Sequence, residues 1–215
     1  MAKRRKKTKT KREELKRYRN KNHIEVGIDE AGRGPLLGRV YVGAVILPPD
    51  DPDFDYSLMR DSKKLSVKRR LEAYEHIKEH AINWTFAYSD EKQIDKENIL
   101  QATFTAMHRA IDQLLVRPDH LLVDGDKFRI YTEDNKIVPH LCVEEGDNTY
   151  ASIAAASIVA KVEHDKYIDE LCDEHPELEV YGLRTNRGYG TAQHIAAIKQ
   201  HGITKWHRRS FGPCK

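Results

Sequence analysis

Five short apolar stretches, each bounded by turn-forming residues, predict five β-strands. The first stretch alternates apolar and polar positions before a glycine-rich turn, and the second is a run of β-branched residues typical of a buried strand. Only a short link separates these two stretches, which predicts an antiparallel hairpin. The five predicted strands cover residues 23–29, 40–47, 82–89, 120–125 and 140–147.

Apolar residues at helical spacing predict the helices. Residues 149–172 are dense in alanine and serine, which predicts a helix packed closely against a flat surface, the sheet. Further helices are predicted over residues 66–80, where Ser66 is a candidate N-cap, over 96–115 and over 191–201. The elements follow the order β-β-α-β-α-β-β-α, which predicts an α/β fold with a mixed sheet and helices on its faces.

Length and composition narrow the class of protein. The chain of 215 residues fits one α/β domain, or one domain with a small appendage. No apolar run reaches a membrane-spanning length, and the N-terminus lacks the apolar stretch of a secretory signal, so we expect no membrane association. The three cysteines are far apart and form no C-x-x-C pair, which argues against a disulfide framework or structural zinc. These features favour a cytoplasmic location.

The formal net charge of +3 hides a strong asymmetry. Residues 1–22 hold 12 Lys and Arg against 2 Asp and Glu, a net charge of +10, which leaves 25 against 32, a net of −7, for residues 23–215. We expect residues 1–22 to form a flexible arm that is too polar to pack. Such an arm indicates binding to nucleic acid or another polyanion, or simply a solvated tail.

Acidic residues stand at the ends of three predicted strands. Asp29 and Glu30 end the first strand, Asp124 the fourth and Asp147 the fifth. Convergence of these strand ends would gather four carboxylates at one edge of the sheet, where they repel one another unless a cation neutralises them. Mg²⁺ prefers oxygen ligands, and two such ions can promote phosphodiester hydrolysis. The pattern therefore predicts a metal-dependent nuclease.

Each acid also has a simpler interpretation. Asp124 precedes Gly125 and could belong to an ordinary turn, while Asp147 could be the N-cap of the helix that follows. Asp29 and Glu30 point in opposite directions if the strand runs on, so one of them could face solvent. Their joint position beside a Gly-Arg-Gly sequence favours the metal site.

Six motifs in order resemble a known family. They are GIDEAGRGPLLG from residue 27, DSKKLS from 61, LLVDGD from 121, GDNTYASIAAASIVAKV from 146, NRGYGT from 186 and HRRSF from 207. Together they resemble type 2 ribonuclease H, the ribonuclease HII family, over roughly residues 23–213. The resemblance implies an RNase H-like five-stranded mixed sheet flanked by helices, with the catalytic core in residues 23–175. Residues 176–215 would form a small helical part with a substrate-binding loop.

The resemblance also implies an activity. Family members cut the RNA strand of RNA–DNA hybrids and nick duplex DNA on the 5′ side of an embedded ribonucleotide, which starts ribonucleotide excision repair. The products carry 3′-hydroxyl and 5′-phosphate ends, and Mg²⁺ or Mn²⁺ is required. No feature of the sequence indicates an obligate oligomer, so we expect a monomer.

The resemblance assigns roles to residues of the motifs. Asp29, Glu30, Asp124 and Asp147 correspond to the catalytic carboxylates that bind the metal ions. Gly32, Arg33 and Gly34, here called the Gly-Arg-Gly loop, correspond to the loop that inspects the ribose 2′-hydroxyl. Glycines let main-chain groups approach a ligand closely, and the 2′-hydroxyl is what distinguishes RNA from DNA.

Three further residues correspond to substrate contacts. Tyr189 resembles the tyrosine that stacks on the sugar at the RNA-to-DNA junction, although it could also be a packing residue of its loop. Ser62 and Lys63 resemble phosphate contacts, although they could simply flank the N-terminus of a helix. We assign none of the 11 histidines to the metal and expect most of them to be surface or packing residues.

The sequence departs from the common family pattern at three places. Glu145, preceded by Glu144, stands where Lys usually precedes the fourth motif, and this extra negative charge could raise the pKa of nearby carboxylates or change metal affinity. The other departures are Asn186 and Arg187 before the Gly-Tyr pair, and Arg39 in place of a common proline. Two other functions stay open at this point: a nucleic-acid-binding module without catalysis, and a different RNase H-fold nuclease such as a junction resolvase.

Overall fold

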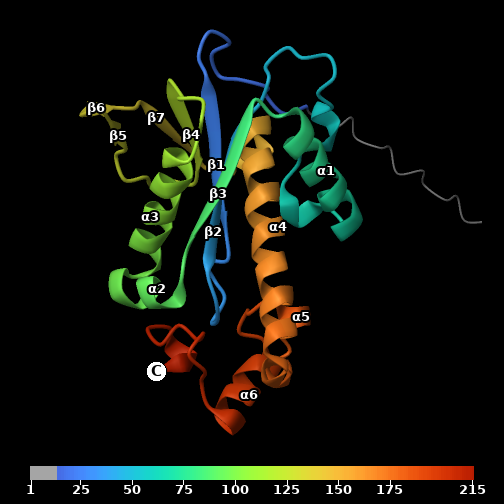
Figure 1. Ribbon diagram of the computed structural model, residues 1–215, viewed down its shortest axis with the longest axis vertical. Helices are drawn as coiled ribbons and strands as arrows, with labels where there is room; N and C mark the ends of the chain where they lie inside the picture. Colours follow the sequence, from blue (N-terminus) through green and yellow to red (C-terminus); the bar gives the residue numbers. More distant parts are fainter. Residues whose placement is uncertain (1–13) are drawn as a thin grey trace, which may run out of the picture.

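The computed structural model describes residues 14–215, and a mixed five-stranded sheet lies at its centre (Figure 1). The strands are β1 (Glu25–Ala31), β2 (Val40–Ile46), β3 (Asn83–Ser89), β4 (His120–Asp124) and β7 (His140–Val143), in the spatial order β3-β2-β1-β4-β7. β1, β2 and β3 pair antiparallel, whereas β1, β4 and β7 pair parallel. The predicted fold class and the predicted hairpin of the first two strands are confirmed.

One face of the sheet is covered by α3 (Ile99–Asp112). Alternate residues of β1, β2 and β4 point to this face and pack against apolar side chains of the helix, because side chains alternate along a strand. The buried cluster includes Val26, Ile28, Val42, Val123, Phe104, Met107 and Ile111. The predicted apolar face of this helix is therefore its core face.

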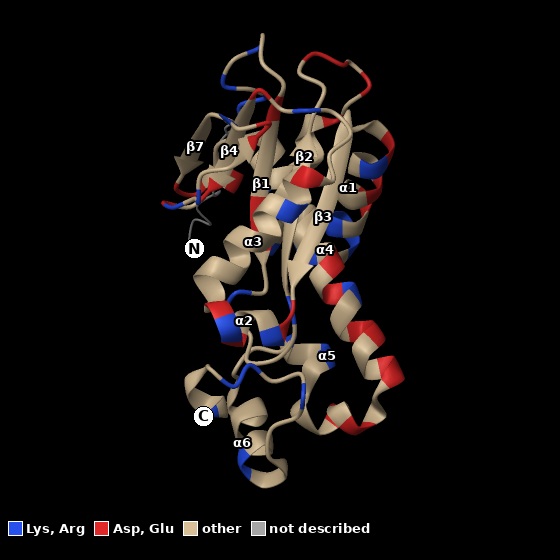
Figure 2. Cartoon of the chain, turned by 60° about the vertical axis from the view of Figure 1, so that its left-hand side comes forward, with Lys and Arg blue, Asp and Glu red and all other residues tan. Residues whose placement is uncertain are grey.

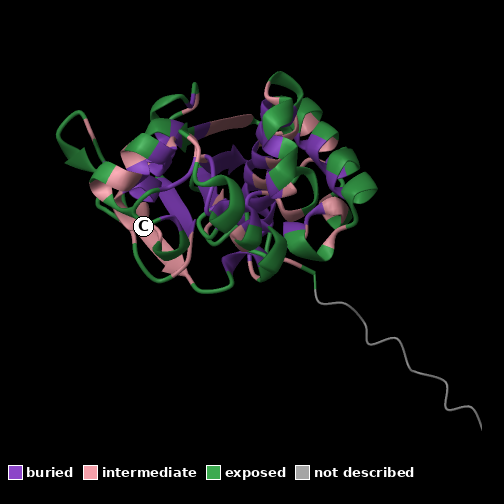
Figure 3. Ribbon diagram, turned by 90° about the horizontal axis from the view of Figure 1, so that it is seen from below, coloured by how far each residue is buried: buried purple, intermediate pink, exposed green. Residues whose placement is uncertain are grey.

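The opposite face is covered by α4 (Ala151–Glu174), with α1 (Val67–His80) packed outside it. A Cβ atom added at Gly27 would lie 2.1 Å from the carbonyl carbon of Ser152, and one at Gly43 would lie 2.4 Å from the carbonyl oxygen of Ala156. The helix thus touches the sheet through main-chain atoms, which explains its small residues. Figure 3 shows the buried residues gathered between the two helical layers.

The predicted helix over residues 96–115 is wrong as a single element. The structure has α2 (Glu91–Glu97) and α3, separated by Asn98, whose φ of 69° is left-handed. The Asn98 side chain accepts hydrogen bonds from the N–H groups of Leu100 and Gln101 and so caps α3. Asparagine tolerates this backbone conformation and is a preferred N-cap, so the break is encoded locally.

The strand predicted over residues 140–147 is too long. β7 ends at Val143, and Glu145 adopts a left-handed φ of 52° that an extended strand cannot contain. A short 3₁₀ helix, η3 (Gly146–Asn148), follows and carries Asp147. Tyr150 occupies the N-cap position of α4 without a side-chain capping hydrogen bond, so the simpler interpretation of Asp147 as the N-cap is wrong.

A small hairpin between β4 and β7 was not predicted. It joins β5 (Thr132–Glu133) to β6 (Lys136–Ile137) through Asp134 and Asn135, which both have positive φ. Two consecutive residues of this kind form the type of turn that suits a two-residue hairpin loop.

Short helices complete the chain beyond α4. They are α5 (Leu183–Asn186), α6 (Ala192–His201) and the 3₁₀ helices η4 (Pro176–Tyr181) and η5 (Gly212–Cys214), with η1 (Tyr56–Leu58) and η2 (Ser62–Lys64) lying before α1. The C-terminal helices pack on the last turns of α4 through Tyr167, Ile168 and Leu171. The small helical C-terminal part is confirmed. The division into parts at residue 175 stays a prediction.

Residues 14–22 pack against the domain, contrary to the expectation for a flexible arm. Lys16 forms a two-way main-chain bridge to α4, donating its N–H to the carbonyl of Thr149 and accepting from the N–H of Ala151. The Glu25 carboxylate accepts hydrogen bonds from the N–H groups of Arg19 and Asn20. Main-chain hydrogen bonds and the partly buried Leu15 hold this segment, although its composition is strongly polar. Residues 1–13 lie outside the described part of the chain.

Two buried histidines form a directed hydrogen-bond chain in the C-terminal part. The N–H of Thr204 donates to Nδ1 of His207 at 2.9 Å, so the proton of a neutral His207 is on Nε2. That N–H donates to Nε2 of His194 at 3.1 Å, and Nδ1–H of His194 then donates to the carbonyl of Tyr189 at 3.0 Å. Protonation of His207 would place its Nδ1–H against the N–H of Thr204, and the Thr204 hydroxyl, 2.9 Å from Nδ1, would have to accept in its place.

This pair predicts an acid-sensitive contribution to stability. Burial, together with the neighbouring His194, lowers the pKa of His207 from 6.5 to about 4. The folded state then binds fewer protons than the unfolded state between those values, so the free energy of unfolding falls as pH drops from 6.5 to 4, by about 3 kcal/mol in total. The variant His207→Gln should lack this component.

Urea unfolding at pH 7 and pH 4.5 checks this expectation. Carboxylates whose folded pKa is raised act in the opposite direction over the same range, so the comparison of wild type with His207→Gln isolates the histidine. The wild type should lose about 2 to 3 kcal/mol more than the variant between the two pH values. Equal losses would contradict the assignment.

Candidate active site

The parallel pairing of β1 with β4 brings the first acids together. Ile28 is in register with Val123, so the next residues, Asp29 and Asp124, lie side by side at the ends of the two strands. Gly27 faces α4 and Leu122 packs with residues of that helix, so by alternation Asp29 and Asp124 are on the α4 side of the sheet. Figure 2 shows acidic positions near these strand ends.

The turn after β7 brings the last acid to the same place. The N–H of Gly146 donates to Oδ1 of Asp124 at 2.7 Å, which ties η3 to the end of β4. Asp147, the next residue, is buried with an exposed fraction of 8%. Asp147 lies in η3, just before α4, and its position depends on the turn at Glu145. The prediction that Asp147 ends a strand is therefore wrong. The predicted convergence of the acids is supported by the structure.

The pKa shifts show that the four carboxylates share one electrostatic environment. Burial raises the pKa of Asp29, and the charges of Glu30, Asp124 and Asp147 raise it further. Burial also raises the pKa of Glu30 and of Asp124. The pKa of Asp147 is raised to about 6 by burial and then by the charges of Asp61 and Asp124. Clustered acids of this kind are an arrangement expected of a functional site.

The donor chemistry of the cluster fits a hard divalent cation, because all four side chains supply carboxylate oxygens. Within residues 14–215, no three His, Cys, Asp or Glu side chains already stand in an arrangement that could hold a metal ion. One oxygen of Asp29 accepts from the N–H of Glu30, and Glu30 pairs with Arg33 at 3.1 Å. A cation among these groups would relieve their repulsion, and the assignment of the four acids as ligands stays a prediction.

Glu144 and Glu145 are not among the main causes of the raised pKa values. Both residues are exposed, and the leading charges that act on Asp147 are those of Asp61 and Asp124. The expectation that Glu144 and Glu145 raise the pKa of nearby carboxylates is therefore not supported.

The Gly-Arg-Gly loop lies between the acids and the C-terminal part. Gly32 has a φ of 90°, and a Cβ atom there would be 2.6 Å from the buried ring of His164. A Cβ atom on Gly34 would be 3.0 Å from Cε1 of Tyr189. The two glycines therefore allow the loop to pack tightly, and the structure brings Tyr189 against the loop although 155 positions separate it from Gly34.

Tyr189 itself is 44% exposed, which a packing residue of the core would not be. Its ring is free to offer a face to a ligand beside the Gly-Arg-Gly loop. Stacking on a sugar or base is a role that fits such a ring. The assignment of Tyr189 to the substrate is supported by this placement and stays a prediction.

The two residues predicted to contact phosphate are placed differently. Lys63 is exposed, and its charge lowers the pKa of Glu30, Asp124 and Asp147, so it stands close to the acids. Ser62 is buried, and its hydroxyl is hydrogen-bonded to that of Ser157 at 2.8 Å. Because Ser62 is almost completely buried, its hydroxyl offers little surface to a phosphate, whereas the exposed Lys63 can reach one directly.

Asp61 is a site residue that the sequence analysis missed. It is 7% exposed, accepts from the N–H of Lys63 at 2.9 Å, and is the leading charged cause of the raised pKa of Asp147. The motif DSKKLS contains it, but only Ser62 and Lys63 of that motif were assigned a role. Its negative charge next to the cluster appears only in the folded chain.

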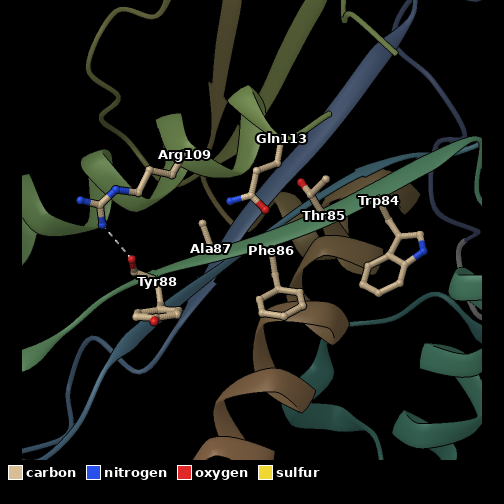
Figure 4. A pocket seen from close by; sticks show the side chains of 7 residues that line it. All are labelled: Trp84, Thr85, Phe86, Ala87, Tyr88, Arg109 and Gln113. Carbon is tan, nitrogen blue, oxygen red and sulfur yellow. Dashed lines mark hydrogen bonds between the residues drawn. The ribbon is translucent and has the colours of Figure 1, made fainter. Parts of the chain in front are cut away.

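Of two hollows in the surface, one adjoins the candidate site and the other lies away from it. A cavity of about 750 Å³ is bordered by Asp147, Asn148 and Lys64 on one side and by Arg17 and Tyr56 on the other, so it adjoins the acids. A second hollow of about 600 Å³ lies along the outer edge of β3, where Arg109 donates to the carbonyl of Tyr88 (Figure 4). None of the predicted site residues borders the second hollow.

The chain is similar to known proteins over nearly its whole length. The sequence model of the family described as Ribonuclease HII matches residues 26–214. Ribonuclease HII from Bacteroides thetaiotaomicron is 48% identical over 194 residues, which are 90% of this chain and 92% of that protein. The chain belongs to the ribonuclease HII family.

Solved structures agree on the fold. The ribonuclease H2 from Pyrococcus horikoshii OT3 superimposes with a TM-score of 0.70 at 22% identity, covering 88% of this chain and 94% of that one. Bst-RNase HIII in complex with Mn²⁺ gives a TM-score of 0.68 at 19% identity, covering 88% of this chain and 67% of that one. At these identities the likeness concerns the fold alone.

Membership in the ribonuclease HII family determines the class of activity. The chain is a metal-dependent endoribonuclease, a hydrolase of the class that degrades the RNA of RNA–DNA hybrids. This excludes the two other functions left open by the sequence, a binding module without catalysis and a junction resolvase. None of the helices among residues 14–215 combines the length and apolar character that crossing a bilayer requires.

Proposed function

We propose that this ribonuclease HII cleaves the RNA strand of RNA–DNA hybrids and also nicks duplex DNA on the 5′ side of a single embedded ribonucleotide. The products would carry 3′-hydroxyl and 5′-phosphate ends, and the nick would start ribonucleotide excision repair in the cytoplasm. The observation that carries the proposal is the contact between Gly34 and Tyr189 beside the four carboxylates. In this proposal the Gly-Arg-Gly loop would read the ribose, and Tyr189 would stack on the neighbouring sugar, next to the carboxylates that act in hydrolysis.

Asp29, Glu30, Asp124 and Asp147 would hold two Mg²⁺ or Mn²⁺ ions. Bound ions of this type supply Lewis acidity and neutralise negative charge at the phosphodiester. The chain contributes a fixed set of oxygen ligands, because Asp124 is held by the N–H of Gly146 and Asp29 by the N–H of Glu30. Glu30 is the most adjustable member, since its pairing with Arg33 is partly exposed.

The remaining residues would bind and orient the substrate. The main chain of the Gly-Arg-Gly loop can approach a ribose closely, because neither glycine has a side chain in the way. Tyr189 would stack on the adjacent sugar, and Lys63 would contact the phosphate near the acids. Together these groups would select a ribonucleotide by its 2′-hydroxyl before the acids act.

Three duplexes of identical sequence test the proposal. One carries a single ribonucleotide, one is a full RNA–DNA hybrid and one is all DNA, and each is incubated with Mg²⁺, with Mn²⁺ and with chelator. We expect a nick on the 5′ side of the single ribonucleotide and multiple cuts in the hybrid, in either metal and never in chelator. Cleavage of the hybrid without any nick at the single ribonucleotide would reject the excision-repair role.

We expect the monomer to be the active form, because the candidate site draws all its residues from one chain. Analytical ultracentrifugation at assay concentrations, with and without a ribonucleotide-containing duplex, would report the mass. A dimer that dissociates with loss of activity would contradict the expectation.

The basic N-terminal residues predict a salt-dependent contribution to binding. Residues 1–13 hold eight Lys and Arg residues and one Glu, a net charge of +7, while residues 23–215 are acidic. Replacing residues 2–13 with an uncharged Gly-Ser linker of the same length should weaken binding to all-DNA duplex. The slope of log K against log salt should become shallower by about 2 or more, because fewer counterions are released.

The linker variant keeps residues 14–22 and their main-chain contacts, so the domain itself is unchanged. Cleavage at saturating substrate should therefore match the wild type. Fluorescence anisotropy across a salt series provides the measurement. An unchanged slope would show that the arm takes no part in binding the duplex.

A further inference from the structure

Arg208 is a completely buried cation beneath the Gly-Arg-Gly loop. Its exposed fraction is 0%, and its guanidinium donates four hydrogen bonds. Nη2 donates to the carbonyl oxygens of Gly32 at 2.6 Å and Arg39 at 3.1 Å, Nη1 to that of Arg33 at 2.9 Å, and Nε to that of Gly38 at 2.8 Å. One side chain thus gathers main-chain carbonyls from both ends of the β1–β2 connection.

The chemistry of this contact is specific to arginine. The planar guanidinium presents five N–H groups in a fixed fork, whereas a lysine offers three donors on a flexible stem. Burial lowers the pKa of Arg208 to about 10, so the side chain is still charged at neutral pH. A buried charge is costly unless it is fully hydrogen-bonded, and here the four carbonyls supply that compensation.

The hydrogen bonds of Arg208 also fix which way the loop points its N–H groups. In a trans peptide the carbonyl and the following N–H point in opposite directions, and the described chain has no cis peptides. Because the carbonyls of Gly32 and Arg33 face Arg208, the N–H groups of Arg33 and Gly34 face away from it. Both residues are exposed, and neither N–H donates to another residue among 14–215. They are free donors beside Tyr189.

His207, the residue before Arg208, is linked to Tyr189, the second residue proposed to read the substrate. His207 connects through His194 to the carbonyl of Tyr189 by the hydrogen-bond chain described above. The main chain adds two links, since the N–H of Arg208 donates to the carbonyl of Leu36 and the N–H of Leu36 donates to that of Gly188, each at 2.8 Å. The C-terminal segment therefore holds the Gly-Arg-Gly loop and Tyr189 in a fixed relation.

We propose that Arg208, assisted by His207, is a positioning residue that aims the N–H groups of the Gly-Arg-Gly loop at the ribose and holds Tyr189 beside them. The inference rests on the proposed function, in which that loop and that tyrosine read the ribonucleotide. Arg208 acts only through the loop, because it is buried and cannot touch the substrate. Selectivity for a ribonucleotide therefore depends on a side chain outside the substrate-binding surface.

The variant Arg208→Lys tests the inference, with Arg209→Lys as a matched control. Arg209 is the next residue and is exposed, so the same exchange there leaves the loop untouched. We expect Arg208→Lys to lower kcat/KM on the single-ribonucleotide duplex by about 10- to 100-fold, the loss typical of a small misplacement of orienting groups. Arg209→Lys should stay within about twofold of the wild type.

Binding to an all-DNA duplex separates positioning from simple loss of structure. That binding needs no ribose recognition, so Arg208→Lys should keep the wild-type affinity and the wild-type stoichiometry, which also counts the folded molecules. A parallel loss in both assays would indicate misfolding and overturn the positioning role. His207→Gln provides a milder second variant, for which we expect a threefold to tenfold loss of kcat/KM with unchanged binding to all-DNA duplex, about what one misdirected orienting group costs.

The outcomes distinguish this inference from the proposed function. If the wild type fails to nick a ribonucleotide-containing duplex, the proposed function fails and the inference fails with it. If the wild type nicks and both Arg208→Lys and His207→Gln nick equally well, only the positioning role is overturned. A selective loss in kcat/KM on the ribonucleotide duplex supports both.

Discussion

Asp124→Asn is expected to lower the rate of nicking at a ribonucleotide by about 1000-fold or more while raising the temperature of thermal unfolding in chelator. Asparagine has the shape of aspartate and can still accept from the N–H of Gly146 through its amide oxygen, so the turn before α4 should survive. The exchange removes one negative charge from the cluster that would hold the metal. Activity is lost because a neutral amide is a poor ligand for a hard cation.

The gain in stability has a separate cause. Without metal, Asp29 is buried beside the charges of Glu30, Asp124 and Asp147, which raise its pKa and oppose folding. Removing the Asp124 charge relieves that repulsion. Charged active sites commonly lower the stability of a protein in this way. We expect the unfolding temperature in chelator to rise by about 2 to 4 °C, which corresponds to about 1 kcal/mol for a domain of this size.

Asp126→Asn is the matched control for both measurements. Asp126 lies two residues further on, and its side chain is 66% exposed. The same loss of charge there should change neither nicking nor the unfolding temperature. Asp124→Asn that nicks within tenfold of the wild type would remove Asp124 from the proposed catalytic set, and a lower unfolding temperature would contradict the repulsion argument.

Gly27→Ala is expected to destabilise the fold by more than about 3 kcal/mol, an effect in the upper range for an overpacked core. The added Cβ atom would lie 2.1 Å from the carbonyl carbon of Ser152 and 2.4 Å from the nitrogen of Ile153. These are main-chain atoms of α4, so no side-chain rotation relieves the clash. The helix must move away from the sheet or the strand must bend.

The same displacement should impair the candidate site, because Asp29 lies two residues beyond Gly27 and Asp147 precedes α4. Gly212→Ala serves as the control, since no atom lies within 4 Å of a Cβ placed there. Urea unfolding monitored by circular dichroism gives the free energies. A loss below about 1 kcal/mol for Gly27→Ala would show that α4 is less tightly seated than these distances indicate, since that is the ordinary cost of a point substitution.

Local patterns were sufficient for most of the sheet and for its two principal helices. Short apolar or alternating stretches bounded by turn-forming residues identified β1 to β4 and β7, because strands of a packed sheet place apolar side chains on at least one buried face. Density of alanine and serine identified α4, because a helix can touch a sheet through its main chain only when its side chains are small. The break at Asn98 was encoded as well, but helical spacing on both sides concealed it.

Some residues of the candidate site were also predictable from local patterns, and others were not. The acids were identified from strand ends and from the resemblance to ribonuclease HII, and parallel pairing of β1 with β4 explains why two of them meet. Asp61 and the guanidinium of Arg208 were not identified as parts of the site, and the burial of the predicted contact Ser62 against Ser157 was not foreseen. Each depends on a contact with a residue far away in the sequence, and a single sequence contains no signal for such a contact.

Period, composition and ordered motifs are local properties of the chain, so they were enough to identify the five strands of the main sheet, its principal helices, the candidate acids and the family. The way in which the Gly-Arg-Gly loop is held became visible only in the folded chain. Arg208 donates to carbonyl oxygens of residues 169 to 176 positions away in the sequence. Its proposed positioning role depends on its burial beneath that loop. Burial is a property of the folded chain, because it is set by everything that packs around a residue.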